Sequence, residues 1–331
     1  MLFNSYIFVF LFLPVALIGF WWSHTKFNRR VALTWLVASS LFYYGFWNPV
    51  YLLLIFASIG FNYGFAYALS RESSGGGSRK TLLGLGVAVN LGLLGYFKYA
   101  NFFVDAANQF LGFSVELHPI VLPLAISFFT FQQIAYLVDV YRDNELERNF
   151  IDYCLFVTFF PQLIAGPIVH HKKMMPQFGN QAEHRFSATN FAGGLTMFFL
   201  GLSKKVLLAD TISEFSNKVF DGALHGTAVN FIESWIGTFA YTFQLYFDFS
   251  GYSDMAIGLA LMFGIRLPMN FNSPYKSLNT ADFWRRWHIT LGHFLRDYLY
   301  IPLGGSRRGI SRLYFTLMVT MALSGLWHGA G

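Results

Sequence analysis

Hydrophobic residues run in long stretches along this chain, and short polar gaps separate the stretches. A helix that crosses a bilayer needs about 20 predominantly apolar residues, and ten stretches approach that length. They cover residues 5–23, 31–47, 50–69, 81–98, 120–140, 151–168, 190–209, 230–249, 251–267 and 313–331. The pattern predicts an all-α fold, a polytopic bundle of transmembrane helices.

The stretch 151–168 is interrupted by Pro161, Gly166 and Pro167. A full crossing here would also carry Lys172 and Lys173 to the outer side, against the preference for positive charge in the cytoplasm. Irregular backbone at membrane depth occurs where protein or water covers it. We therefore expect a broken or re-entrant element.

The segment 281–299 holds five charged side chains, each costing about 2.5–3.5 kcal/mol at a bilayer centre. They are Asp282, Arg285, Arg286, Arg296 and Asp297. We expect an interfacial or bundle-interior helix rather than a lipid-facing span. Helical spacing predicts one shared face for Trp284, His288, Leu291 and Leu295, with Arg285 and Arg286 on other faces.

Composition and charge support a membrane protein. The 331 residues are 55% hydrophobic and 12% charged, whereas soluble domains carry about 25% charged residues. The net charge of +6 comes from short basic clusters between apolar stretches, which favours cytoplasmic loops and not a nucleic-acid surface. Loops 24–30 and 70–80 hold Lys and Arg, so we expect them in the cytoplasm and the N-terminus outside. Residues 73–78, rich in Ser and Gly, read as a flexible stretch.

Two histidines stand beside tryptophans in apolar surroundings, His288 after Trp287 and His328 after Trp327. An ionisable group in such a segment marks a functional site unless it is a satisfied core residue, and both interpretations remain open. We expect a buried, neutral imidazole that can act as a general base towards a hydroxyl. The pair His170-His171, followed by Lys172 and Lys173, is typical of a basic surface stretch, and we expect no metal site.

Position along the chain adds a prediction of depth. Arg312 marks the cytoplasmic start of the last span, and His328 lies about 23 Å further along a helix, towards the outer leaflet. His288 should lie nearer the cytoplasmic face. Acidic groups at membrane depth need partners, and Arg285 and Arg286 are the candidates for Asp248 and Asp254. For these two carboxylates we favour a structural ion pair over a catalytic role.

Several long motifs resemble the membrane-bound O-acyltransferase (MBOAT) superfamily, and within it the membrane subunits of bacterial alginate O-acetyltransferases. The resemblance runs essentially from end to end of the chain. The motifs are Leu94–Phe102, Pro123–Phe131, Tyr136–Arg142, Leu163–Pro167, Tyr246–Gly258 (YFDFSGYSDMAIG), Asp282–Thr290 (DFWRRWHIT), Leu295–Ile301 and Gly325–Gly329 (GLWHG).

The resemblance implies an enzyme that moves an acetyl group from a cytoplasmic thioester, with acetyl-CoA as the expected donor, to hydroxyls of an exported polysaccharide. It implies His328 as the catalytic base and His288 as the second signature histidine at the donor end of a tunnel. Trp327, Trp287, Trp284, Arg285, Arg286, Asp248 and Asp254 are then expected to line the tunnel or support it. No bound cofactor is expected.

The family also implies a multi-pass protein of the bacterial inner membrane, with periplasmic acetyltransferases as partners and alginate or a similar polymer as acceptor. Because family members continue with further helices after the Trp-His-Gly motif, we expect residues 1–331 to form one integral membrane domain that is incomplete at its C-terminus. Two alternatives remain open. One is transfer of D-alanyl or another acyl group to an envelope polymer, and the other is an acyl-group conduit that serves a separate transferase.

Overall fold

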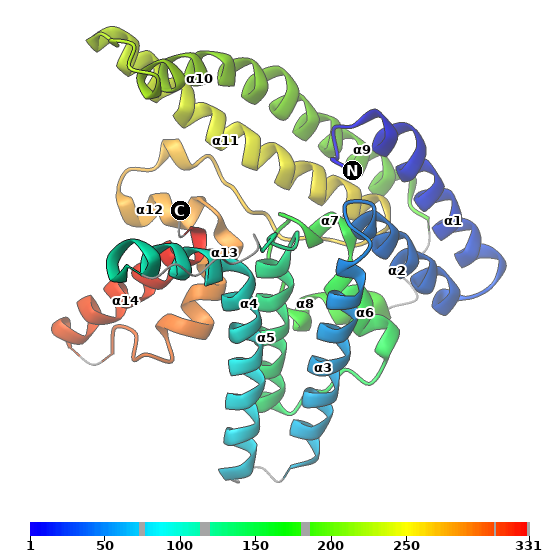
Figure 1. The fold of residues 1–331 in the computed structure, drawn as a ribbon. Helices are drawn as coiled ribbons and strands as arrows, with labels where there is room; N and C mark the ends of the chain where they lie inside the picture. The colour runs from blue at the N-terminus through cyan, green and yellow to red at the C-terminus, as the bar shows by residue number, and fades with distance from the viewer. Residues whose placement is uncertain (73–76, 113–119, 180–185, 308, 330–331) are drawn as a thin grey trace. The chain divides into compact units, whose positions relative to one another are not determined.

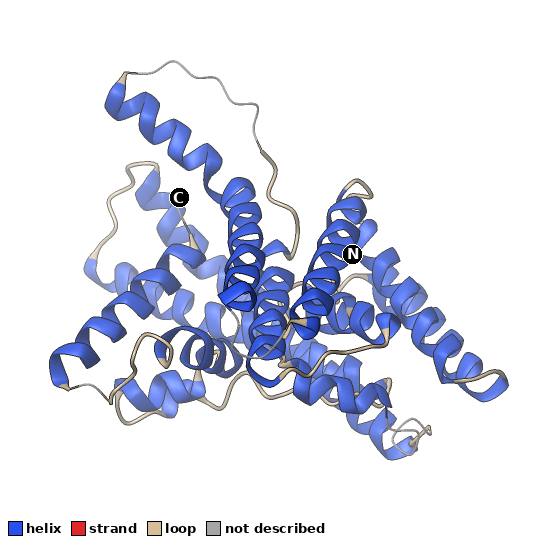
Figure 2. Cartoon of the chain, turned by 90° about the horizontal axis from the view of Figure 1, so that it is seen from below, coloured by secondary structure: helices blue, strands red, loops and turns tan. Residues whose placement is uncertain are grey.

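The computed structural model describes residues 1–72, 77–112, 120–179, 186–307 and 309–329, and within these ranges it contains helices and no strand (Figure 2). The prediction of an all-α fold is confirmed. Four residues of the predicted flexible stretch, 73–76, lie outside the described ranges, and residues 77 and 78 already belong to a helix.

The chain forms two compact units built from interleaved segments. Unit 1 comprises Met1–Ser39, Ala165–Pro167 and Gly179–Ile289, and unit 2 comprises Ser40–Ile164, Ile168–Phe178 and Thr290–Gly331. Helix α2 (Arg29–Gly45) belongs to both units. The assignment of the whole chain to one membrane domain stays a prediction.

Unit 1 is built around one long helix, α11, along which α9 and α10 pack (Figure 1). Its helices are α1 (Leu13–Lys26, after a π-helical turn at Phe8–Phe12), α9 (Ala188–Ser203), a π-helical segment at Lys204–Ala209, α10 (Asp210–Leu224), α11 (Phe231–Met262), a 3-10 turn at Pro274–Lys276 and α12 (Thr280–Arg286). Asn230 and Glu233 start α11 with a reciprocal capping box, in which each side chain accepts a hydrogen bond from the other residue's backbone N–H.

The continuity of α11 corrects the prediction of two separate spans at 230–249 and 251–267. Gly251 does not end the helix. It faces Gly201 of α9, where a Cβ on Gly251 would lie 2.7 Å from the Gly201 carbonyl oxygen. A glycine inside a helix costs about 1 kcal/mol relative to alanine, and an open backbone in apolar surroundings costs several. The helix therefore continues to Met262, and Gly264 follows two residues later with a φ of +77°, the left-handed conformation that commonly ends helices.

Unit 2 contains a group of packed helices in which α3 and α5 contact each other and both contact α4 and α6 (Figure 1). Its helices are α3 (Tyr51–Arg71), α4 (Gly77–Leu111), α5 (Ile126–Asp143), α6 (Phe150–Thr158), α7 (Phe160–Leu163), α8 (His171–Gly179), α13 (Ile289–Leu295), a π-helical turn at Arg296–Tyr300 and α14 (Ile310–His328).

Buried amides connect the helices of unit 2. The side chains of Asn62 and Asn90 exchange hydrogen bonds between α3 and α4, at 3.1 and 2.7 Å. Gln133 of α5 donates to Ser58 of α3 and accepts from Tyr153 of α6. Such interhelical hydrogen bonds stabilise helix contacts where the hydrophobic effect between helices is weak.

The predicted break in the segment 151–168 is confirmed. Helix α6 ends at Thr158, Phe159 leaves the helical conformation, and the short α7 places Pro161 in its first turn, where proline's missing N–H costs nothing. Across the described residues, five helical stretches combine spanning length with sufficient apolar character. They are Phe8–Lys26, Tyr51–Arg71, Gly77–Phe110, Ala188–Leu224 and Ile310–His328.

Candidate functional site around His328 and His288

His328 is the last residue of α14 and packs against the preceding tryptophan. The ring centroids of His328 and Trp327 lie 4.5 Å apart with an angle of 64° between the planes. The imidazole is exposed, which corrects the expectation of a buried ring. The two rings meet edge-on, and the indole of Trp327 supports the imidazole from within α14.

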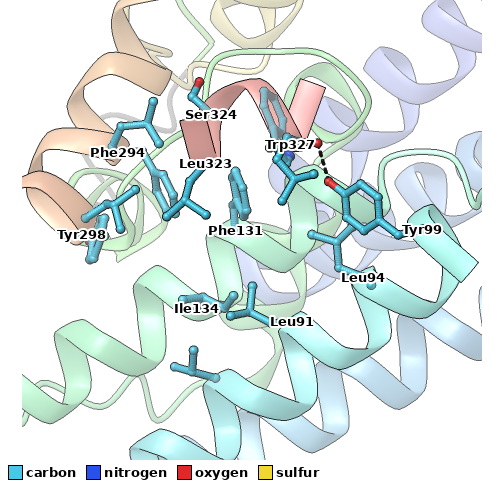
Figure 3. A pocket seen from close by; sticks show the side chains of 15 residues that line it. Leu91, Leu94, Tyr99, Phe131, Ile134, Phe294, Tyr298, Leu323, Ser324 and Trp327 are labelled. Carbon is cyan, nitrogen blue, oxygen red and sulfur yellow. Dashed lines mark hydrogen bonds between the residues drawn. The ribbon is translucent and has the colours of Figure 1, made fainter. Parts of the chain in front are cut away.

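Trp327 forms part of the wall of an apolar pocket of about 380 Å³ in unit 2 (Figure 3). Its indole stacks on Phe131 of α5, with ring centroids 5.3 Å apart and planes at 28°. The indole Nε1 is buried, and no residue in the described part of the chain accepts its hydrogen bond. The other walls come from α4, α5, the segment 294–299 and α14, through residues such as Leu91, Leu94, Ile134, Phe294, Tyr298 and Leu323.

His288 is buried in unit 1, as predicted, with 4% of its surface exposed. It stands after α12 with a φ of +44°, a left-handed conformation that few non-glycine residues adopt. Its ring lies edge-on to Phe249 of α11 at 4.8 Å. The next residue, Ile289, donates its backbone N–H to the carbonyl of Asn270. Strained backbone that is held on both sides is often found at functional sites.

The predicted single helical face of the segment 281–299 is wrong. Helix α12 ends at Arg286 and α13 begins at Ile289, so Trp284 and His288 do not share a face with Leu291 and Leu295. The two residues between these helices, Trp287 and His288, are neither proline nor glycine, so the helix is interrupted for another reason. Trp287 is drawn into an aromatic cluster, stacking on Phe283 at 5.7 Å and meeting Phe271 edge-on at 5.1 Å.

The other residues of this motif take separate roles. Trp284 and Arg285 are exposed, and Arg285 donates to the carbonyl of Ala281 in its own helix. Arg286 pairs with Asp282, with 2.9 Å between Nε and Oδ2. This pairing, one helical turn apart, connects the third and last residues of α12 and gives Arg286 a partner from its own helix.

The carboxylates Asp248 and Asp254 form ion pairs, as favoured, although the partners differ from those predicted. Lys205 bridges Asp248 and Asp210, each at 2.7 Å, and Lys204 pairs with Asp254. The lysines lie where α9 passes into its π-helical segment, directly against α11. The packing of α9 against α11 therefore makes Lys204 and Lys205 the partners of these carboxylates, in place of Arg285 and Arg286. Sequence spacing does not reveal this packing.

A cluster of four side chains in unit 2 was missed by the sequence analysis. Oδ2 of Asp139 accepts from the Tyr298 hydroxyl at 2.7 Å and lies 3.1 Å from Nδ1 of His171, while Nδ1 of His170 lies 3.1 Å from the Tyr298 hydroxyl. His171 is buried and His170 half-buried, so the prediction of a basic surface stretch is wrong for these histidines. Asp139 and Tyr298 belong to the motifs Tyr136–Arg142 and Leu295–Ile301. Their place in these motifs is the sequence feature that could have identified them.

Burial is the main influence on the pKa of His170. Burial lowers the pKa of His170 below its ordinary value of 6.5, against the opposing attraction of Asp139 and Asp297. His293 shows the same direction, with burial again the main cause and Arg296 adding to it. Both imidazoles are therefore kept neutral in the folded protein near pH 7.

Comparison with known proteins identifies relatives over the whole chain. The chain is 47% identical to a peptidoglycan O-acetyltransferase of Helicobacter pylori and covers 67% of that protein. It is 45% identical to a probable alginate O-acetylase of Pseudomonas aeruginosa, covering 62% of it. A teichoic acid D-alanyltransferase of Bacillus subtilis is 28% identical over 64% of the chain and 55% of its own length.

The chain thus spans about two thirds of the length of the O-acetyltransferases it matches. The sequence profile of the membrane-bound O-acyltransferase family matches residues 147–331. This range contains α11, both tryptophan–histidine pairs and the helix α14 that ends at His328. The chain belongs to the membrane-bound O-acyltransferase family.

Proposed function

We propose that the protein containing this chain transfers an acetyl group from a thioester donor on the cytoplasmic side to hydroxyls of an exported cell-envelope polysaccharide. The observation that carries the proposal is the position of His328. Its imidazole meets the indole of Trp327 edge-on, and Trp327 forms a wall of the apolar pocket. We propose acetyl-CoA as the donor, in keeping with the similarity to O-acetyltransferases.

The residues suggest how the transfer would proceed. A neutral imidazole at His328 accepts the proton of the acceptor hydroxyl while the oxygen attacks the thioester carbonyl carbon. The C–O bond forms, the C–S bond then breaks, and the proton passes from the imidazole to the leaving thiolate. The products are an acetyl ester and a free thiol. His288 is proposed to act at the donor side of this reaction, with Trp287 and Trp284 near it in the chain.

Relatives inform the choice of acceptor. The two O-acetyltransferases named above act, by name, on peptidoglycan and on alginate, and both acceptors are polysaccharides with free hydroxyls. We place the protein in the inner membrane, with the N-terminus outside and periplasmic acetyltransferases as partners. The D-alanyltransferase relative supports a second candidate, transfer of D-alanyl to an envelope polymer.

The proposal is tested in a deletion strain that produces the full-length protein as wild type, His328→Ala or His225→Ala. His225 is exposed at the end of α10 and serves as the control. Acetyl and D-alanyl esters are measured separately in exported polysaccharide and in peptidoglycan, at matched protein levels.

Acetyl esters restored by wild type and His225→Ala but not by His328→Ala support the proposal and identify the polymer. Esters restored equally by all three would make the protein a conduit or scaffold. D-alanyl esters in place of acetyl esters would establish the second candidate.

A further inference from the structure

Lys98 places a cation in the middle of α4, a helix of spanning length whose residues are mostly apolar. The resemblance to the family singles out its motif, Leu94–Phe102, and the function proposed above leaves the motif without a role. A lysine at membrane depth is costly and is found where it has a specific partner. The partner of Lys98 therefore indicates what the residue does.

The partner is the last turn of α14. Lys98 donates a hydrogen bond from Nζ to the carbonyl oxygen of Trp327. The adjacent Tyr99 donates its hydroxyl to the carbonyl of Leu326 at 2.6 Å (Figure 3). The last four carbonyls of a helix have no partner within the helix. Two of them are thus satisfied by α4, and a third, Gly325, accepts from the backbone of Gly329 at 3.3 Å.

Lys98 also fixes the indole on which His328 rests. Its ammonium lies 5.5 Å from the centre of the Trp327 ring system, within the range of a cation–π contact. Phe131 stacks against the same indole. Backbone and side chain of Trp327 are therefore both held, and the imidazole of His328, 4.5 Å away on the next residue, takes its orientation from them.

We propose that Lys98, assisted by Tyr99, is a positioning residue that sets the orientation of His328. The inference rests on the function proposed above. A positive group at the C-terminal end of α14 also complements the partial negative charge of that helix end. A simple helix cap would need only the hydrogen bonds, whereas Lys98 additionally contacts the ring that supports the imidazole.

The test uses purified full-length protein as wild type, Lys98→Met, Lys98→Arg, Tyr99→Phe and Lys80→Met. Methionine keeps the length and apolar stem of lysine without its charge. Lys80 is an exposed lysine on the same helix and serves as the control. Three quantities are measured: kcat and KM for acetyl transfer, the thermal unfolding midpoint, and the rate at which diethyl pyrocarbonate modifies His328, followed by mass spectrometry.

We expect Lys98→Met to lower kcat by about 10- to 100-fold, since misplacing a catalytic group by about 1 Å has effects of that size. KM should change little, and the modification rate of His328 should rise as the ring loses its support. Lys98→Arg should recover part of kcat, Tyr99→Phe should show a smaller loss, and Lys80→Met should match wild type.

Wild-type kcat and wild-type His328 modification in Lys98→Met would overturn the proposal. If Lys98→Met does not fold, Lys98→Arg and Tyr99→Phe decide, and wild-type values of both quantities in both variants would overturn it. Failure of the proposed function gives a different result. In that case His328→Ala retains activity, while the modification rate in Lys98→Met still reports whether Lys98 orients the ring.

Discussion

The Tyr298 hydroxyl donates a hydrogen bond to Oδ2 of Asp139 over 2.7 Å and connects residues 159 positions apart in the chain. A phenol has one proton to donate, so Nδ1 of His170, at 3.1 Å from the same hydroxyl, must be the donor towards Tyr298. Nδ1 of His171 likewise donates to the Asp139 carboxylate. The arrangement therefore requires a proton on Nδ1 of each imidazole.

Substituting Tyr298→Phe should destabilise the protein. The change leaves Asp139 and Nδ1 of His170 each without one partner, and an unsatisfied buried polar group costs about 1–3 kcal/mol. The free energy of unfolding of the full-length protein in detergent measures the effect. Tyr300→Phe, two residues further on, is the control. If both variants have the same free energy of unfolding as wild type, the Tyr298–Asp139 hydrogen bond contributes nothing to stability.

Stability should fall as the pH is lowered through the range in which His170 titrates. Burial lowers the pKa of His170 below 6.5, so below pH 6.5 the unfolded chain binds a proton that the folded protein does not. Unfolding is then favoured as the pH decreases, until the folded pKa is reached and the loss stops. His293 acts in the same direction.

The unfolding midpoint of wild type, His170→Gln and His225→Gln between pH 8 and pH 5 checks this expectation. His170→Gln should flatten part of the pH dependence, whereas His225→Gln should leave it unchanged. A wild-type profile in His170→Gln would mean that other groups cause the pH dependence.

Gly258→Ala should weaken the contact between α9 and α11. A Cβ at Gly258 would lie 2.5 Å from the carbonyl oxygen of Gly194 and 2.6 Å from the backbone nitrogen of Phe198. Backbone atoms cannot move aside as side chains do, so the helices must separate, at a cost of about 1–3 kcal/mol. Interfaces of this kind rely on small residues that let helix backbones approach.

The control for this prediction is Gly60→Ala in α3, where a Cβ would meet nothing within 4 Å. Alanine is the better helix former by about 1 kcal/mol, so this variant should match or exceed wild-type stability. If both variants unfold at the wild-type midpoint, the packing of α9 on α11 tolerates an added methyl group.

His288 permits a test that separates backbone strain from chemistry. Its φ of +44° is tolerated by asparagine better than by most residues. His288→Asn should therefore preserve the fold, whereas His288→Ala adds strain to the loss of the ring. If His288 takes part in the reaction, both variants lose acetyl transfer while His288→Asn unfolds near the wild-type midpoint. An active His288→Asn variant would limit His288 to a structural role.

The sequence by itself determined the class of fold and the location of most helices. Long apolar stretches leave the backbone no alternative to helices, because every N–H and C=O needs a partner in apolar surroundings. Pro161, Gly166 and Pro167, together with the positive charge that follows them, predicted the break in the segment 151–168. The pairs Trp287-His288 and Trp327-His328 drew attention as candidates because ionisable groups are scarce in such stretches.

Only the tertiary structure determined which of these elements contact one another and through which residues. The break between Arg286 and Ile289 depends on aromatic packing around Trp287, and Lys204 and Lys205 neutralise Asp254 and Asp248 because α9 lies against α11. The contact of Lys98 with Trp327 spans 229 positions. Periodicity records which face of a helix is apolar, but a pairing between distant residues depends on which helices meet and at what register. The partner helices and their register are determined by how side chains pack between helices, and no local stretch of sequence specifies that packing.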